Sequence, residues 1–129
     1  MHGVDTNIVV RYLIGDDPRQ GAKARAVIGE VPVFVPRTVL LEAEWVLRGV
    51  YDMPPQQVIP ALRAFAGLPG VLVEDAGFVA QALNWAEAGM DFADALHLAA
   101  TTGCEGFLTF DKRFVRAGAR LGGIPVTAP

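Results

Sequence analysis

Hydrophobic and polar residues alternate along the chain in two recurring patterns. Short apolar runs bounded by turn residues predict buried strands, and apolar residues that recur every three or four positions predict helices. The expected strands are residues 3–4, 33–35, 71–73, 106–110 and 124–126. The expected helices are residues 8–13, 18–28, 37–51, 55–66, 75–88 and 91–103, and a short segment after 111. Strands that alternate with helices predict an α/β fold with a parallel sheet covered by helices on both faces.

The chain has 129 residues, which favours a single domain spanning residues 1–129. Its hydrophobic content of 52% is high, but no apolar run approaches the roughly 18 residues that would span a bilayer. No secretory leader is expected, and the single Cys104 cannot form an internal disulfide. These features favour the cytosol and predict no membrane association.

The net charge of −3 gives no general attraction to nucleic acid. The charge is unevenly distributed, however, because four cations follow Phe107 and only Asp111 opposes them. These cations are Lys112, Arg113, Arg116 and Arg120. The pattern is compatible with a local basic surface, and equally with an ordinary solvated helix face.

Asp5 stands where the first strand gives way to the first helix. Ligands of parallel α/β sheets bind just beyond the carboxyl ends of the strands, so a carboxylate at this position is a candidate site residue. The alternative is that Asp5 only caps the helix. Asp111 follows Thr109 at the end of a later strand, and the same two interpretations are open for it.

The helix expected at residues 37–51 carries two glutamates of different predicted character. Its apolar stripe consists of Val39, Ala43, Val46, Leu47 and Val50. Glu44 lies away from this stripe, four residues before Arg48, and is expected to be solvated with an ordinary surface partner. Glu42 flanks the stripe and is expected to turn toward the sheet without a cation. A buried carboxylate without a partner is costly and favours protonation or a bound metal.

Asp91 and Asp94 open the helix expected at residues 91–103. Asp91 fits a helix cap best. Asp94 shares a polar face with His97 and Thr101, opposite the apolar residues of the helix. Helix N-termini meet the edge at which parallel strands end, so Asp94 is expected near Asp5, Glu42 and Asp111.

Four converging carboxylates repel one another, which favours a hard cation among them. Oxygen ligands without a His or Cys cluster suit Mg²⁺ or Mn²⁺ and not zinc. Such an ion activates water and neutralises phosphate charge, which makes hydrolysis of nucleic acid the natural chemistry.

In order and spacing, four segments of the chain resemble the motifs of PIN-domain proteins of the VapC toxin type. They are Val4-Asp5-Thr6-Asn7, Leu41-Glu42-Ala43, Asp91-Phe-Ala-Asp94-Ala-Leu-His97 and Leu108-Thr-Phe-Asp111. The resemblance implies an α/β/α sandwich with a central twisted parallel sheet of four to five strands. It also implies an endoribonuclease that depends on Mg²⁺ or Mn²⁺, a homodimer, and inhibition by a cognate antitoxin protein.

The resemblance also assigns roles to individual residues. The catalytic and metal-binding acids are Asp5, Glu42, Asp94 and Asp111, and the supporting polar residues are Thr6, Asn7 and Thr109. Asp91 is an additional acid that assists the site or only caps its helix. The cations nearest to the motifs are Arg11, Arg37 and Lys112, which are candidates for binding RNA or antitoxin and equally for ordinary surface charge.

Two other classes of function remain open from the sequence. One is a Mg²⁺-dependent phosphate-transfer or phospho-accepting domain, although no Lys stands at the end of a late strand. The other is a catalytically weak partner-binding module. His2 and His97 lack a second group for metal-free cleavage of RNA. Cys104 is expected to be a small buried residue.

Overall fold

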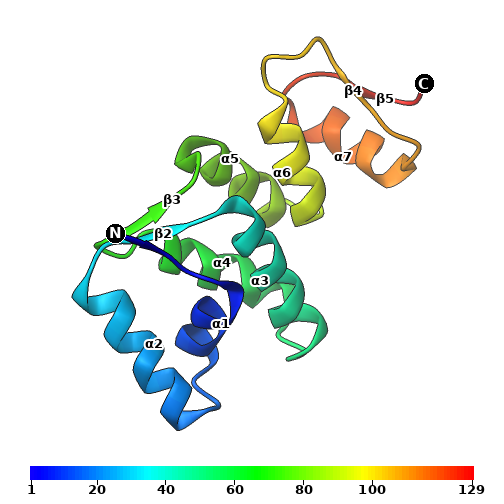
Figure 1. Ribbon diagram of the computed structural model, residues 1–129. Helices are drawn as coiled ribbons and strands as arrows, with labels where there is room; N and C mark the ends of the chain where they lie inside the picture. The colour runs from blue at the N-terminus through cyan, green and yellow to red at the C-terminus, as the bar shows by residue number, and fades with distance from the viewer. The chain divides into compact units, whose positions relative to one another are not determined.

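The computed structural model describes all 129 residues, which form five short strands and seven helices (Figure 1). The chain forms two compact units, residues Met1–Ala76 and Gly77–Pro129. All strand pairs are parallel, and at least one helix separates each strand from the next along the chain. The predicted α/β class is therefore confirmed.

The first unit contains a three-stranded parallel sheet in the order β1-β2-β3. Its elements are β1 (His2–Gly3), α1 (Thr6–Ile14), α2 (Pro18–Glu30), β2 (Val33–Val35), α3 (Arg37–Gly49), α4 (Pro55–Ala66) and β3 (Val71–Val73). His2 is in register with Val33, and Val33 with Val71. The three strands therefore end at one edge of this sheet (Figure 1).

The core of the first unit is formed by the central strand and by one face of each surrounding helix. Its most buried side chains are Val9, Val33, Val35, Leu40, Leu47, Val58, Leu62 and Phe65. Each such side chain contributes about 1.5–3 kcal/mol when it leaves water completely. Tyr12 of α1 packs against Phe65 of α4, with ring centroids 5.7 Å apart. This contact ties the helix that follows Asp5 to the rest of the unit.

The second unit begins within α5 (Ala76–Glu87). Its further elements are α6 (Phe92–Ala100), β4 (Phe107–Leu108), α7 (Lys112–Leu121) and β5 (Val126–Thr127). β4 pairs with β5 in parallel, with Phe107 opposite Val126. A Cβ added at Gly118 would lie 2.6 Å from Cγ2 of Val126, so α7 approaches β5 this closely only because residue 118 is glycine.

The predicted elements are present, with shorter strands and some shifted ends. The hydrogen-bonded strands form one sheet of three strands and one of two, where a sheet of four to five strands was expected. The helix expected to end at Gly103 ends at Ala100. Thr101 donates hydrogen bonds from its hydroxyl to the carbonyls of His97 and Leu98, which satisfies the last turn without a glycine. None of the helices has the length and apolar character needed to cross a membrane.

Candidate functional site

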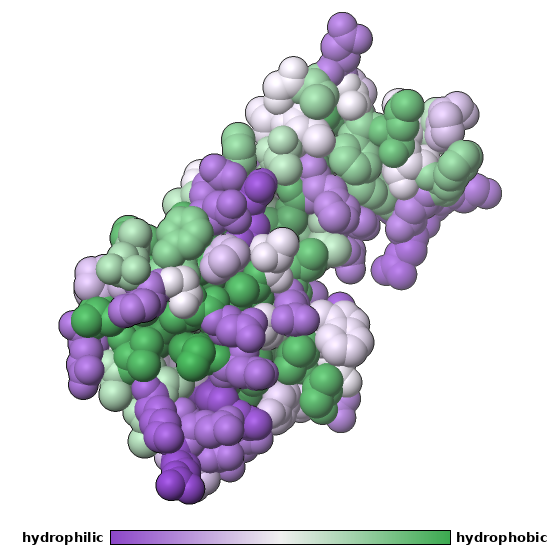
Figure 2. All heavy atoms as spheres, in the orientation of Figure 1, coloured by the Kyte–Doolittle hydropathy of each residue, from purple (hydrophilic) through white to green (hydrophobic).

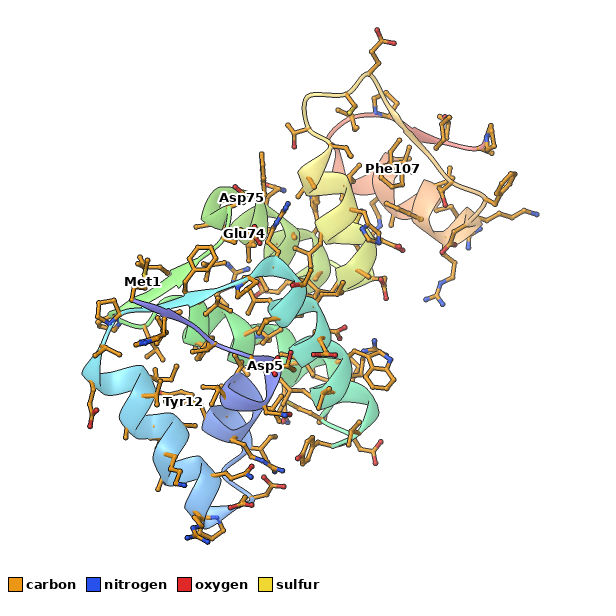
Figure 3. The ribbon with its side chains drawn as sticks, viewed as in Figure 1. Met1, Asp5, Tyr12, Glu74, Asp75 and Phe107 are labelled. Carbon is orange, nitrogen blue, oxygen red and sulfur yellow. The ribbon has the colours of Figure 1, made fainter.

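Asp5 lies at the junction of β1 and α1, at the edge where the three strands of the first unit end (Figure 3). Its side chain is exposed, and its Oδ1 accepts a hydrogen bond from the amide of Thr6 at 2.7 Å. The capping interpretation is therefore confirmed for Asp5. The cap uses one carboxylate oxygen, and Oδ2 has no hydrogen bond within the chain, so a cap and a ligand role are compatible.

Thr6 links Glu42 to the strand end that carries Asp5. The Thr6 side chain is buried, and its hydroxyl donates a short hydrogen bond to Oε1 of Glu42 in the second turn of α3. The two residues are 36 positions apart in the sequence. The structure thus brings together Asp5, Thr6 and Glu42, three of the predicted site residues. Asn7, a fourth, is exposed in the first turn of α1.

The predicted environments of Glu42 and Glu44 are wrong, because Glu42 is exposed and Glu44 is only 6% exposed. The buried face of α3 is centred on Leu40, Ala43 and Leu47, and Leu40 was not included in the predicted stripe. Including it rotates the buried face toward Glu44 and away from Glu42. The predicted partner of Glu44 is confirmed, since Nε of Arg48 lies 2.8 Å from Oε2 of Glu44. Glu42 is therefore not a buried carboxylate without a partner.

Two acids at the same sheet edge were not predicted as site residues. Glu74 directly follows β3, and its Oε1 accepts a hydrogen bond from the amide of Arg37 at 2.9 Å. This bond, together with the charge of Arg37, holds the pKa of the Glu74 carboxyl below its usual range. Asp75 lies 3.4 Å from Nε of Arg37 and, at φ +49°, is in the left-handed region (Figure 3). The sequence signal was the same as for Asp5, an acid directly after a strand.

The cations proposed for RNA binding in the first unit both have partners inside that unit. Arg37 is held by Glu74 and Asp75. Arg11 donates to Asp16 at 2.8 Å and to the hydroxyl of Tyr51 at 3.1 Å. The hydrogen bond with Asp16 raises the pKa of Arg11. These contacts show a structural use for both arginines, and their binding of RNA stays a prediction.

In the second unit, Asp94 occupies the first turn of α6 and is half-buried. Partial burial raises the pKa of its carboxyl, and the negative charges of Asp91 and Asp111 raise it further. Asp91 caps the helix by accepting a hydrogen bond from the Asp94 amide at 3.0 Å, as expected. His97 is exposed on the same side of α6, and its charge opposes the shift. Three acids of the second unit therefore influence one another electrostatically.

Asp111 is fixed at the start of α7 by hydrogen bonds on both sides. Its Oδ1 accepts from the amides of Arg113 at 2.9 Å and Phe114 at 3.3 Å, which confirms the capping interpretation. Its own amide donates to the hydroxyl of Thr109 at 3.0 Å. Thr109 is thus placed to orient Asp111, and its supporting role in a site stays a prediction. Lys112 is exposed at the first position of α7.

The donor chemistry of these residues fits a hard divalent cation, because every candidate ligand is a carboxylate or hydroxyl oxygen. In the first unit, Asp5 and Glu42 both accept hydrogen bonds from Thr6. In the second unit, the charges of Asp91 and Asp111 contribute to the raised pKa of Asp94, alongside its partial burial. In neither unit are three or more His, Cys, Asp or Glu side chains gathered closely enough to hold a metal ion. The joint action of all four predicted acids stays a prediction.

One prediction about a residue outside the site is wrong. Cys104 is exposed, because it lies in the turn after α6 and not on the buried face of that helix. Among the aromatic residues on helices, Trp85 and Phe92 are buried, whereas Trp45 is 58% exposed on α3.

Comparison with known proteins places these residues in a wider context. A family model described as the PIN domain matches residues 4–120. Among solved structures, the chain is similar to the VapC20 toxin of Mycobacterium tuberculosis, described as cleaving the sarcin-ricin loop. The match has 25% sequence identity and a TM-score of 0.45, and it covers 92% of this chain and 95% of the toxin. No curated protein sequence matches the chain.

Proposed function

Because this chain belongs to the PIN-domain family, a family of nucleases, we propose that it is a metal-dependent endoribonuclease formed by one PIN domain over residues 1–129. The observation that carries the proposal is the family match over residues 4–120, which contains all four predicted catalytic acids. These are Asp5, Glu42, Asp94 and Asp111. The acids fit hydrolysis of a phosphodiester by water, a reaction that needs charge neutralisation at the phosphate.

The ion that fits this donor set is Mg²⁺ or Mn²⁺, and the four acids are the residues that would hold it. When bound, such an ion supplies an activated water and a positive charge for the scissile phosphate. The raised pKa of Asp94 supports the assignment, because partial burial and the nearby negative charges destabilise its ionised form and a cation would relieve that cost.

The supporting residues act on the acids through hydrogen bonds. Thr6 orients Glu42 by donating its buried hydroxyl, and Thr109 holds the amide of Asp111. Asp91 fixes the amide of Asp94 and so sets the start of α6. Asn7 is exposed in the first turn of α1 and is proposed to contact the substrate. Among the proposed RNA-binding cations, Lys112 is exposed, whereas Arg11 and Arg37 already have ion-pair partners.

The motif resemblance to VapC-type toxins supports a finer proposal. We infer that the protein is the toxin of a toxin–antitoxin pair, that it acts in the cytosol as a homodimer, and that a small antitoxin inhibits it. Co-expression with a short upstream reading frame tests this proposal. A stable complex with suppressed cleavage is the expected result, and unchanged cleavage in a mixture with that product would contradict it.

The ribonuclease proposal is tested with the purified full chain and a fluorescent single-stranded RNA. Cleavage is expected with Mn²⁺ or Mg²⁺, and it should disappear in EDTA and in the variants Asp5→Ala and Asp94→Ala. Asp16→Ala is the matched control, since Asp16 is an exposed acid whose partner is Arg11. Cleavage that persists in EDTA, or that all three variants retain equally, would overturn the mechanism.

A further inference from the structure

An aromatic side chain stands exposed directly beside a predicted catalytic acid. Phe110 lies between Thr109 and Asp111, and it is 87% exposed. The neighbouring aromatic residues are used differently, since the ring of Phe107 packs against that of Phe114 with centroids 5.1 Å apart. The ring contact between β4 and α7 is therefore made without Phe110, whose exposed ring is available to a ligand.

Cations cover the face of α7 that begins next to Phe110. Lys112, Arg113 and Arg116 are exposed, while Phe114 and Gly118 form the buried face of the same helix. Residues 107–129 contain four cations and one acid, a local net charge of +3 on a chain whose net charge is −3. Hydrophobic and strongly hydrophilic side chains lie next to each other over this end of the unit (Figure 2).

From this juxtaposition we propose that Phe110 and the basic face of α7 bind single-stranded RNA. Phe110 stacks on an unpaired base, and Lys112, Arg113 and Arg116 contact phosphates of the same strand. The inference rests on the proposed ribonuclease function and names the surface that holds its substrate. Its physical basis is that an exposed aromatic ring beside a positively charged groove or helix is the usual platform for single strands.

The aromatic ring favours RNA over the other anionic partner that the charge alone would fit, an acidic polypeptide. Charge attracts both ligands equally, but a polypeptide of Glu and Asp offers no flat π surface. A nucleotide base does, and stacking tolerates every base because each has such a face. The surface is therefore expected to recognise single strands without strong sequence preference.

The stacking role is tested by binding measurements on the full chain in EDTA, where the proposed cleavage does not occur. The probe is a fluorescent oligouridylate, and the comparison ligand is an abasic ribose-phosphate oligomer of equal length. Phe110→Ala should weaken oligouridylate binding about fivefold or more and leave the abasic oligomer unaffected. Phe110→Trp should retain binding, whereas Phe110→Leu, which is apolar without a π face, should not.

Phe78→Ala is the matched control, because Phe78 is a partly exposed phenylalanine on α5, at 41%. It should bind both ligands like the unmodified protein. Equal binding by Phe110→Ala and the unmodified chain would overturn the proposal. The proposal would also be overturned if Phe110→Ala weakened binding of the abasic oligomer as much as binding of oligouridylate. Polyglutamate is a third probe, and equal weakening of its binding would point to an acidic protein partner instead.

The cations are tested through the salt dependence of the same binding. Arg113→Gln and Arg116→Gln should each weaken binding of both RNA-like ligands and lower the slope of log K against log salt by about 0.7. An unchanged slope would show that Arg113 and Arg116 do not contact RNA phosphates. Because binding in EDTA and cleavage with Mn²⁺ are separate measurements, failure of this inference leaves the ribonuclease proposal standing, and absence of cleavage does not decide the binding result.

Discussion

The two units of the protein differ in whether their carboxylates form ion pairs. In the first unit, three arginines form ion pairs with four acids. Arg11 pairs with Asp16 at 2.8 Å, Arg48 with Glu44 at 2.8 Å, and Arg37 with Glu74 and Asp75 at 3.5 and 3.4 Å. In the second unit, no ion pair forms at Asp91, Asp94 or Asp111. Partial burial and the two neighbouring acids instead raise the pKa of Asp94.

This difference separates structural acids from candidate ligands. A carboxylate with its own cation has its charge satisfied within the fold and gains little from a metal ion. A carboxylate surrounded by like charge is destabilised in its ionised form and gains most from one. By this criterion Asp5 and Glu42 belong with the acids of the second unit, because their partners are an amide and a hydroxyl of Thr6 and not a cation.

The largest expected effect is on cleavage. Asp94→Asn keeps the side-chain volume but removes the charge, and it should lower the cleavage rate on the order of 10²-fold or more, the scale typical for loss of one preorganised charged group. Glu44→Gln should cleave at the unmodified rate, because Glu44 is committed to Arg48. Initial rates with Mn²⁺ measure both variants. Similar losses in the two would abolish the distinction between structural and ligand acids.

The next largest effect is expected on stability, from a substitution that disturbs the packing of α7. Gly118→Ala places a methyl group within 2.6 Å of Val126 and should lower the free energy of unfolding by about 1–3 kcal/mol through overpacking. Gly77→Ala is the control, because a Cβ at Gly77 meets no atom within 4 Å. Denaturant unfolding of both variants tests this, and equal stability would show that α7 shifts freely and does not hold Asp111 in place.

The paired acids of the first unit should act on stability alone. Glu44→Gln removes the charge from a buried carboxylate, while Arg48 is 41% exposed and reaches water. The expected loss in the free energy of unfolding is therefore only about 1 kcal/mol. Urea unfolding at pH 7 measures it. No loss, or a gain, would show that this pair does not stabilise the unit.

The smallest predicted effect has the opposite sign. Because the folded state raises the pKa of Asp94, it disfavours the ionised carboxylate, and the stability of the protonated form is lost as the pH rises through that pKa. Asp94→Asn should therefore be more stable than the unmodified protein at pH 7. The difference should shrink as the pH falls through the raised pKa. Thermal unfolding from pH 4 to 8 tests this, and a difference that grows on acidification would contradict it.

Local signals in the sequence were enough to place most of the elements. Pro18 at the first turn of α2, the turn residues around Val71–Val73, and Asp111 before α7 mark their boundaries correctly. The family motifs were recognisable as well, since the match over residues 4–120 includes all of them. These features depend on residues close together in the chain, where spacing and capping chemistry determine the structure.

Contacts between residues far apart in the sequence could not be predicted from these local patterns. The buried face of α3 is centred on Leu40, Ala43 and Leu47, slightly rotated from the predicted stripe, and this rotation exchanged the predicted environments of Glu42 and Glu44. The pairing of Arg37 with Glu74 joins residues 37 positions apart. The bond from Thr6 to Glu42 also joins two separate helices. Such partners follow from tertiary packing, which periodicity alone does not define.

The central claim is tested most directly by titrating the full chain with Mn²⁺ and measuring the bound ion by electron paramagnetic resonance. Mn²⁺ should bind the unmodified protein and the Asp16→Asn variant equally. It should bind Asp5→Asn and Asp94→Asn at least tenfold more weakly, since each replaces a charged carboxylate ligand of the proposed ion with a neutral amide. Equal Mn²⁺ affinity in all four proteins, with each variant still folded, would contradict the account.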